Sequence, residues 1–199
     1  NISWELTMRS NQEFYTYLQY SLYEAIAFFN FRIYIFGSEK TIKAIMFDSY
    51  CEKEVLKSII NSAHKGLTPV IKEAIHFFKQ YERKIFIQPP QCDLSLYTSN
   101  EQKVLKELLL IQPGNTISYG ELAAQCGFNG GARFVGNVMA SNIFPVLFPC
   151  HRVIRSNGDT GNYSGGIKIK EFLLAWEKEN ENSSVKQRTI HHAEYTNKK

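Results

Sequence analysis

The sequence predicts an α+β protein of two domains, and three observations lead to that prediction. Within residues 1–92, β-rich segments are followed by amphipathic helical ones, whereas the residues after 92 are mostly helical. Between the two patterns lies IQPPQCDLSLYTSN, where Pro89 and Pro90 can continue neither a helix nor a central strand. A chain of 199 residues with 44% hydrophobic and 21% charged content is long and apolar enough for two small cores. We therefore expect an N-terminal domain at 1–92, a C-terminal domain at 93–180 and a flexible tail at 181–199.

The N-terminal domain is predicted to contain a β-hairpin followed by two helices. FRIYIF and TIKAIMFD are rich in β-branched and aromatic residues, and GSEK between them is a turn. KEVLKSIINSAH then carries apolar residues at helical spacing. TPVIKEAIHFFKQYE repeats this spacing, with Thr68 as N-cap and Pro69 at the first helical position. We find no chemical motif in this half of the chain.

The C-terminal domain is predicted to contain a helix-turn-helix. NEQKVLKELLLI is an amphipathic helix that ends at QPGN. Ser118 caps a short helix that closes at Gly127, and the turn FNGG separates it from a third helix in ARFVGNVMASN. This order matches a DNA-binding helix-turn-helix, although many helical hairpins share it.

One face of the third helix carries almost no side chains. Ala132, Gly136 and Ala140 follow one another at intervals of four, which places them on the same face. Such a face either packs tightly on another helix, which is the more common case, or approaches a ligand closely. Arg133 adjoins it, and a small-residue helix with one arginine would suit a narrow DNA groove.

Charge and cysteine usage are those of a soluble intracellular protein. The net charge of +4 and the pI of about 8.8 are compatible with nucleic acid but do not require it. The longest apolar run, AIAFFNFRIYIF, is too short to span a bilayer, and no basic n-region with an apolar h-region opens the chain. We expect a cytoplasmic protein, or a nuclear one in a eukaryote.

The four cysteines lie far apart, without the spacing of a zinc site or a disulfide framework: Cys51, Cys92, Cys126 and Cys150. His191 and His192, in the tail, are expected to be solvated rather than metal ligands.

The stretch LFPCHRVIRSNGDTGNYSGG holds the candidate reactive group. VLFP is expected to be a strand that carries Cys150 to its end, so His151 would point to the opposite face and reach the thiol only through a water or a turn. A free thiol titrates near about 8.5 and needs help from its neighbours to react at neutral pH. A buried inert cysteine is the common alternative. The glycine-rich loop that follows is costly in entropy, however, and is seldom built only to pack a thiol.

Together these residues resemble the O6-alkylguanine-DNA alkyltransferases, also called methylated-DNA–protein-cysteine methyltransferases. PCHRV resembles the active-site signature of that family, and ISYGELAA, ARFVGNVMASN, GNYSGG and KEFLLAWE flank it in the expected order. The similarity runs from about Gln102 to Glu177, whereas the N-terminal half is similar only in size and in its strand-then-helix order. The resemblance implies a ribonuclease H-like N-terminal domain and a C-terminal domain of the winged helix-turn-helix type.

The resemblance also implies an activity. The protein would transfer the alkyl group of O6-alkylguanine irreversibly to Cys150, once per molecule, after the base has been flipped out of the duplex. Its partner would be double-stranded DNA carrying O6-alkylguanine, bound through the minor groove, with no cofactor, metal or membrane involved. A monomer is implied, and activity on O4-alkylthymine and cooperative binding along DNA stay open.

The resemblance assigns catalytic roles to five residues. Cys150 would be the alkyl acceptor and His151 the water-mediated base. Glu177 would orient His151. Asn142 would hold the loop before the cysteine, and Tyr119 would crowd the neighbouring phosphate so that the nucleotide rotates.

Two further groups of residues would bind the substrate. In the DNA-binding helix, Arg133 would fill the gap that the flipped nucleotide leaves, beside the small residues Ala132, Gly136 and Ala140. The guanine pocket would be formed by Tyr163, Ser164, Val153 and Met139. The sequence departs from the family pattern at three places, namely Ile143 instead of a proline after Asn142, Glu101 instead of an aromatic residue, and Phe134 instead of a small one.

Three other classes of protein fit parts of the sequence. A non-enzymatic binder of alkylated DNA would resemble the same family but lack the acceptor, whereas Cys150 is present. A cysteine–histidine hydrolase would use Cys150 as an acyl carrier, but no oxyanion hole is evident. A helix-turn-helix regulator of transcription would leave the PCHRV loop unexplained.

Overall fold

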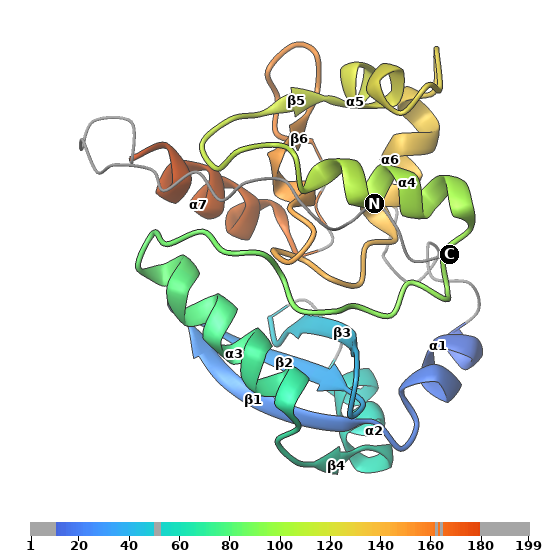
Figure 1. The fold of residues 1–199 in the computed structure, drawn as a ribbon, viewed down its shortest axis with the longest axis vertical. Helices are drawn as coiled ribbons and strands as arrows, with labels where there is room; N and C mark the ends of the chain where they lie inside the picture. Colours follow the sequence, from blue (N-terminus) through green and yellow to red (C-terminus); the bar gives the residue numbers. More distant parts are fainter. Residues whose placement is uncertain (1–10, 50–52, 162, 164, 180–199) are drawn as a thin grey trace.

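The structure is a computed structural model, which describes residues 11–49, 53–161, 163 and 165–179. It has two layers, with a four-stranded sheet and three helices below and a mostly helical part above (Figure 1). The mixed α/β architecture and the two-part layout confirm the predicted fold class. The boundary between 92 and 93 stays a prediction.

The lower sheet has the strand order β3-β2-β1-β4. The predicted hairpin is confirmed, because β2 (Phe31–Gly37) pairs antiparallel with β3 (Ile42–Phe47). The strand β1 (Leu22–Phe28) was not predicted; it overlaps the start of the long apolar run and pairs antiparallel with β2. The short β4 (His64–Lys65) runs parallel to β1.

Three helices belong to the sheet layer: α1 (Asn11–Leu18), α2 (Lys53–Ser62) and α3 (Pro69–Glu82). The predicted start of α3 is confirmed, because Thr68 Oγ1 accepts a hydrogen bond from the Ile71 N–H and Pro69 is the first helical residue. The apolar face of α3 packs on the sheet, where the Phe78 ring meets the Phe28 ring edge-on at 4.9 Å. The C-terminal end of α3 lies beneath α7 (Figure 1).

The upper layer contains the predicted helices. Their caps are local, and the side chains of Thr98 and Ser118 each form a capping box with the glutamate three residues later. The elements are α4 (Ser99–Leu108), β5 (Ile117–Ser118), α5 (Tyr119–Gln125), α6 (Ala132–Ala140), a 3-10 helix (Cys150–Arg152), β6 (Val153–Ile154) and α7 (Ile167–Lys178). Strands β5 and β6 pair in parallel beside the helix-turn-helix that α5 and α6 form.

The edge of β3 joins the two layers. The Ile42 N–H donates to the Gln91 carbonyl at 2.8 Å, and the Asp93 N–H donates back to the Ile42 carbonyl at 2.8 Å. Three residues along, the Ile45 N–H donates to the Ile143 carbonyl at 2.8 Å. The edge strand of the sheet therefore holds both the connecting segment and the loop before Cys150.

The predicted strand VLFP is wrong. Residues 143–149 form bends, turns and one isolated bridge between Pro145 and Phe148, and Cys150 begins the 3-10 helix. Val146 has φ 71°, which no strand tolerates. In a strand, the backbone groups of this segment would bond to a neighbouring strand. Here the Asn142 side chain bonds to them, because it donates to the Phe148 carbonyl at 2.9 Å and accepts from the Phe144 N–H at 3.0 Å.

Other predictions concern absences or residues that the structure leaves out. Cys51, Ser164, His191, His192 and the rest of the tail lie outside the described residues. Among the helices that are described, none is long and apolar enough to cross a membrane. Within the same ranges, no cluster of three or more histidine, cysteine, aspartate or glutamate side chains could hold a metal ion.

Candidate active site

Cys150 lies at the start of the 3-10 helix with 2% of its surface exposed. Its Sγ accepts a hydrogen bond from Nδ2 of Asn142 at 2.9 Å. Burial raises the pKa of the thiol, while the Asn142 N–H and the positive charge of Lys170 act in the opposite direction. Asn142 therefore favours the thiolate form of Cys150.

His151 and Glu177 form a buried pair next to this cysteine. Nε2 of His151 lies 2.9 Å from Oε1 of Glu177, and both side chains are fully buried. Burial lowers the pKa of His151, although Glu177 opposes that shift, so the imidazole is neutral near pH 7. With the proton on Nε2, Nδ1 is an unprotonated acceptor. It is buried and has no hydrogen-bond partner among the described residues.

The carboxylate of Glu177 accepts hydrogen bonds from several parts of the chain. Arg152 donates from Nε to Oε2 at 3.0 Å and from Nη2 to Oε1 at 2.7 Å. The hydroxyl of Tyr81, on α3, donates to Oε1 at 2.6 Å, and the Gly114 N–H donates to Oε2 at 3.1 Å. Burial alone would raise the pKa of Glu177, but His151 and Arg152 hold it well below its usual range. The carboxylate stays ionised and fixes the ring of His151.

A second buried cation, Lys170 on α7, acts on the Cys150 thiol through its charge. Its Nζ donates to the Val153 carbonyl at 2.6 Å, and the residue is fully buried. Burial lowers its pKa to about 8, and the negative charge of a Cys150 thiolate would raise it. The lysine and the thiol therefore stabilise each other's charged forms.

The predicted guanine pocket is partly described. The rings of Tyr163 and His151 meet edge to face, with 6.4 Å between their centroids. The Tyr163 hydroxyl is buried beside the Cys150 thiol and helps to lower the pKa of that thiol. Burial and then the charge of Cys150 raise the pKa of Tyr163, so it keeps its proton. Val153 and Met139 are buried at 0% and 5% exposure. Ser164 lies outside the described residues.

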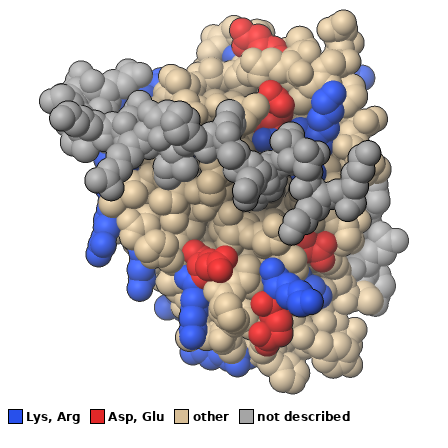
Figure 2. Space-filling view, viewed as in Figure 1, with Lys and Arg blue, Asp and Glu red and all other residues tan. Residues whose placement is uncertain are grey.

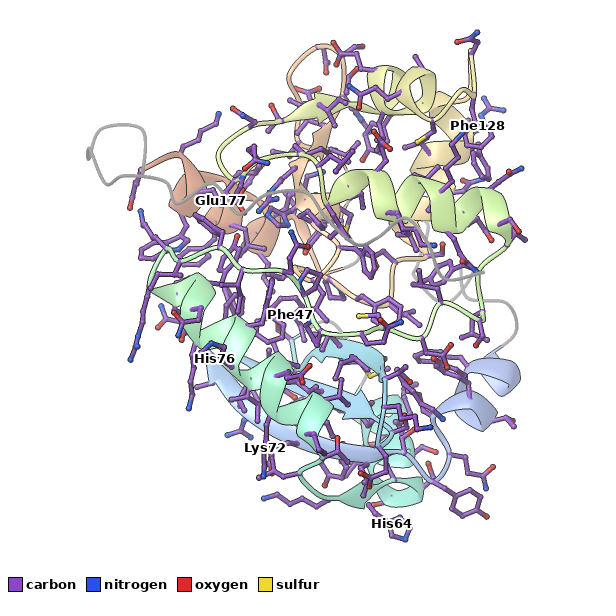
Figure 3. The ribbon with its side chains drawn as sticks, in the orientation of Figure 1. Phe47, His64, Lys72, His76, Phe128 and Glu177 are labelled. Carbon is purple, nitrogen blue, oxygen red and sulfur yellow. The ribbon has the colours of Figure 1, made fainter. Side chains whose placement is uncertain are left out.

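The loop around Tyr163 is tightly packed. A Cβ on Gly165 would come within 2.7 Å of the Tyr163 ring and 3.2 Å of the ring of Phe47, on β3. Figure 3 shows Phe47 where the lower layer meets the upper one, and Glu177 on α7 above it. Tyr119 begins α5 and is half-buried, and its hydroxyl would lie 3.2 Å from a Cβ on Gly161. The sheet layer and α5 thus both limit the room in this loop.

The bare face of α6 is open. Ala132 and Arg133 are exposed, and Gly136 and Ala140 are half-buried. A Cβ on Gly136 would meet no atom within 4 Å, so this face does not pack on another helix of the described chain. Charge does not single out a binding face on the side shown in Figure 2, where positive and negative side chains lie interspersed. The open face of α6 is the feature that would let a ligand come close to the helix backbone.

The structure brings together four of the five predicted catalytic residues: Cys150, Asn142, His151 and Glu177. Tyr119, the fifth, lies beside this cluster, with its ring centroid 6.0 Å from Nζ of Lys170. Arg133, predicted to bind DNA, lies apart on the surface. Sequence reasoning missed Tyr81, Arg152 and Lys170 as members of the cluster. Tyr81 follows the helical apolar spacing of a core residue, and its partner is 96 positions away. Lys170 does carry a signal, since it stands between Ile169 and Leu173 on the buried face of α7.

The fold and this cluster define a helix-turn-helix domain built around a buried cysteine–histidine–glutamate site. Residues 99–179 match the family model of the 6-O-methylguanine DNA methyltransferase DNA-binding domain. Over this region the chain is similar to the methylated-DNA–protein-cysteine methyltransferases, as the sequence resemblance implied.

Individual methylated-DNA–protein-cysteine methyltransferases are similar to this chain over a stretch of comparable length. The methyltransferase of Homo sapiens is 50% identical over 76 residues, which are 38% of this chain and 37% of the human protein. That of Methanothermobacter thermautotrophicus is 42% identical over 80 residues, 40% of this chain and 44% of the archaeal protein. The matched region thus spans less than half the length of these relatives.

Solved structures match over more of the chain. The structure of Mycobacterium tuberculosis OGT in complex with DNA has a TM-score of 0.68 at 28% identity and covers 79% of this chain and 93% of that one. The O6-methylguanine-DNA methyltransferase of Pyrococcus kodakaraensis has a TM-score of 0.60 at 24% identity, covers 79% of this chain and 98% of that one, and supports the fold alone. The likeness therefore extends into the N-terminal half, where the sequence alone showed little.

Proposed function

We propose that the protein repairs DNA by direct reversal, moving the alkyl group of O6-alkylguanine in double-stranded DNA onto Cys150. The observation that carries the proposal is the position of the Cys150 thiol, bonded to Asn142 and adjacent in sequence to a His151 that Glu177 orients. The match of residues 99–179 to the 6-O-methylguanine DNA methyltransferase DNA-binding domain supports it. So does the DNA complex of the Mycobacterium tuberculosis relative.

The chemistry follows from the states of these groups. Nδ1 of His151 accepts the thiol proton of Cys150 through a bridging water, and the charge that develops on the imidazole is stabilised by Glu177. The Sγ of Cys150 then forms a bond to the alkyl carbon, while the bond from that carbon to O6 breaks and its electron pair goes to the purine. A proton from a tyrosine hydroxyl such as that of Tyr163 neutralises the leaving guanine. The thioether has no good leaving group, so each molecule reacts once.

The base must leave the duplex before this reaction. Extrusion costs a few kcal/mol, and α6 is the element that offsets it. Its open face, with Ala132, Gly136 and Ala140, enters the minor groove, and Arg133 fills the space that the flipped nucleotide leaves. Tyr119, at the start of α5, crowds the adjacent phosphate.

Two variants test the proposal. Cys150→Ser should still bind a duplex with one O6-methylguanine but transfer no methyl group, because a serine hydroxyl is a far weaker nucleophile than a thiolate. Cys126→Ser, at another buried cysteine, is the matched control and should transfer at the wild-type rate. Methyl transfer by Cys150→Ser would refute the assignment of Cys150 as the alkyl acceptor. Lesion binding without transfer by the wild-type protein would indicate a non-enzymatic lesion binder.

A further inference from the structure

The hydroxyl of Tyr97 bridges the backbone on both sides of Asn142. It donates a hydrogen bond to the Ser141 carbonyl at 2.8 Å and accepts one from the Ile143 N–H at 2.9 Å. A proline at 143 would have no N–H to offer. In this chain that N–H is buried and needs a partner, and Tyr97 is that partner.

Tyr97 is itself firmly held. It is 8% exposed, and its carbonyl accepts a hydrogen bond from the Gln102 side chain at 3.0 Å. The next residue, Thr98, is the N-cap of α4. Burial raises the pKa of Tyr97 well above its usual range, so its hydroxyl remains a donor at any pH of interest. The backbone of Tyr97 is therefore fixed at the start of α4.

The other side of the Asn142 loop is fixed by the sheet layer. The Ile143 carbonyl accepts from the Ile45 N–H on β3 at 2.8 Å. Both polar groups of the Ile143 backbone are thus bound by residues outside the loop. Between these anchors, Asn142 has its backbone held in place while its side chain reaches Cys150 Sγ at 2.9 Å and the Phe148 carbonyl at 2.9 Å.

We propose that Tyr97 is a positioning residue for alkyl transfer, which holds Asn142 so that its Nδ2 stays bonded to the Sγ of Cys150. The inference rests on the proposed function. Without the hydroxyl, the Ser141 carbonyl and the Ile143 N–H lose their partner together, and the loop no longer favours one position of Asn142. The thiolate then loses a donor that lowers its pKa.

The test is Tyr97→Phe in the full-length protein, with single-turnover methyl transfer from a duplex carrying O6-methylguanine. We expect a rate about tenfold lower, from one lost charge-assisted hydrogen bond at the thiolate. Tyr17→Phe is the matched control, because the Tyr17 hydroxyl donates to the Asp93 carbonyl at 3.4 Å, in the same connecting segment but away from Asn142. That control should react within about twofold of wild type.

A double-mutant cycle separates positioning from general stability. In an Asn142→Ala background, Tyr97→Phe should change the rate by less than about twofold, because the group it positions is gone. The same fold-loss in both backgrounds, or a wild-type rate for Tyr97→Phe alone, would overturn the proposal.

A second measurement does not depend on DNA. Iodoacetamide alkylation of Cys150, followed by peptide mapping across pH, reports the pKa of the thiol directly. Tyr97→Phe should move the midpoint upward by about half a pH unit or more, and an unmoved midpoint would overturn the proposal. If the wild-type protein transfers no methyl group yet this midpoint moves, the proposed function fails and the role of Tyr97 at Cys150 stands.

Discussion

The hydroxyl of Tyr81 donates a hydrogen bond to Oε1 of Glu177 over 2.6 Å and lies 3.5 Å from Nε2 of His151. Tyr81 belongs to α3 of the sheet layer, whereas Glu177 belongs to α7 of the helical layer. The N-terminal half, which carries no recognisable motif, therefore supplies a donor to the carboxylate that orients the histidine.

Tyr81→Phe should change the pH dependence of methyl transfer. Removing a donor makes the Glu177 carboxylate more basic, so it holds the imidazolium of His151 more strongly and raises the pKa of His151. Because His151 must be neutral to accept the thiol proton, the acidic limb of the rate profile should move to higher pH by about half a unit to one unit. Tyr34→Phe, on β2, should leave the limb in place, and an unmoved limb in Tyr81→Phe would rule out this coupling.

Glu177→Gln should lower both rate and stability. The neutral amide leaves the buried Arg152 without a counter-charge, so we expect a loss of about 3 kcal/mol in the free energy of unfolding, measured with urea at pH 7. Transfer should fall by about 100-fold or more because His151 loses its partner. Glu179→Gln removes the exposed partner of a half-buried Lys84 and should cost less than about 0.5 kcal/mol.

The same carboxylate governs acid stability. The folded-state pKa of Glu177 lies well below its ordinary value of 4.5. Its contribution is therefore complete above about pH 4.5 and is lost as the pH falls from there toward the folded-state pKa. Urea titrations between pH 7 and pH 3 should show a smaller decline for Glu177→Gln than for wild type, and parallel curves would contradict the low pKa.

Lys170→Met should lower the rate of methyl transfer at neutral pH and leave it close to the wild-type rate at high pH. The positive charge of Lys170 lowers the pKa of Cys150, so its loss should leave less thiolate near pH 7 and reduce the rate about tenfold. The deficit should shrink as the pH rises through the raised pKa of the thiol. Lys168→Met, exposed on the same helix, is the control. A pH-independent deficit would show that the charge is not the cause.

Lys170 also makes stability pH-dependent on the alkaline side. Its folded-state pKa of about 8 lies below the ordinary 10.5, so the burial of the charged form disfavours folding at low pH. This penalty is present below about pH 8 and disappears as the pH rises toward 10.5. The Lys170→Met variant should lose that part of the pH dependence in thermal unfolding.

Arg133→Ala should impair repair of duplex DNA selectively. Arg133 is exposed at the start of α6 and touches none of the cysteine site, so the reaction of Cys150 with free O6-methylguanine base should stay within about twofold of wild type. Transfer from the duplex should fall about 10- to 100-fold, because nothing fills the space of the flipped nucleotide. Equal losses on both substrates would remove this role from Arg133.

Gly136→Leu should separate stability from DNA binding. A side chain at 136 meets no atom within 4 Å, and leucine favours a helix over glycine by about 0.8 kcal/mol, so the variant should be at least as stable as wild type. Affinity for duplex DNA should fall about tenfold or more, because the leucine side chain would keep the α6 backbone from lying close to the minor groove. Gly120→Leu is the matched control and should keep the wild-type affinity, because position 120 is equally open but lies on α5.

Features with local signals were predictable from the sequence. The caps Thr68 and Ser118 and the hairpin between β2 and β3 depend on residues a few positions apart, and each is confirmed. The loop before Cys150 was mispredicted because its β-rich residues are overridden by the side chain of Asn142, several positions earlier. The β-propensity of individual residues gives no information about such a side-chain hydrogen bond.

The partners of the site residues were not predictable in the same way. Cys150, His151, Asn142 and Glu177 were named through the family resemblance, and spacing alone left Cys150 open as an inert core residue. Tyr97 meets Ser141 across 44 positions, and Tyr81 meets Glu177 across 96. Both tyrosines stand at apolar positions, so only the folded arrangement reveals their hydroxyl contacts.

The most direct test of the account is the mass of the intact protein after reaction with a duplex that carries one O6-methylguanine, followed by peptide mapping. If Cys150 is the acceptor, each molecule gains one methyl group, the gain saturates at that level, and the group is located on Cys150. An unchanged mass with the lesion still bound, or a methyl group on a different cysteine, would contradict it.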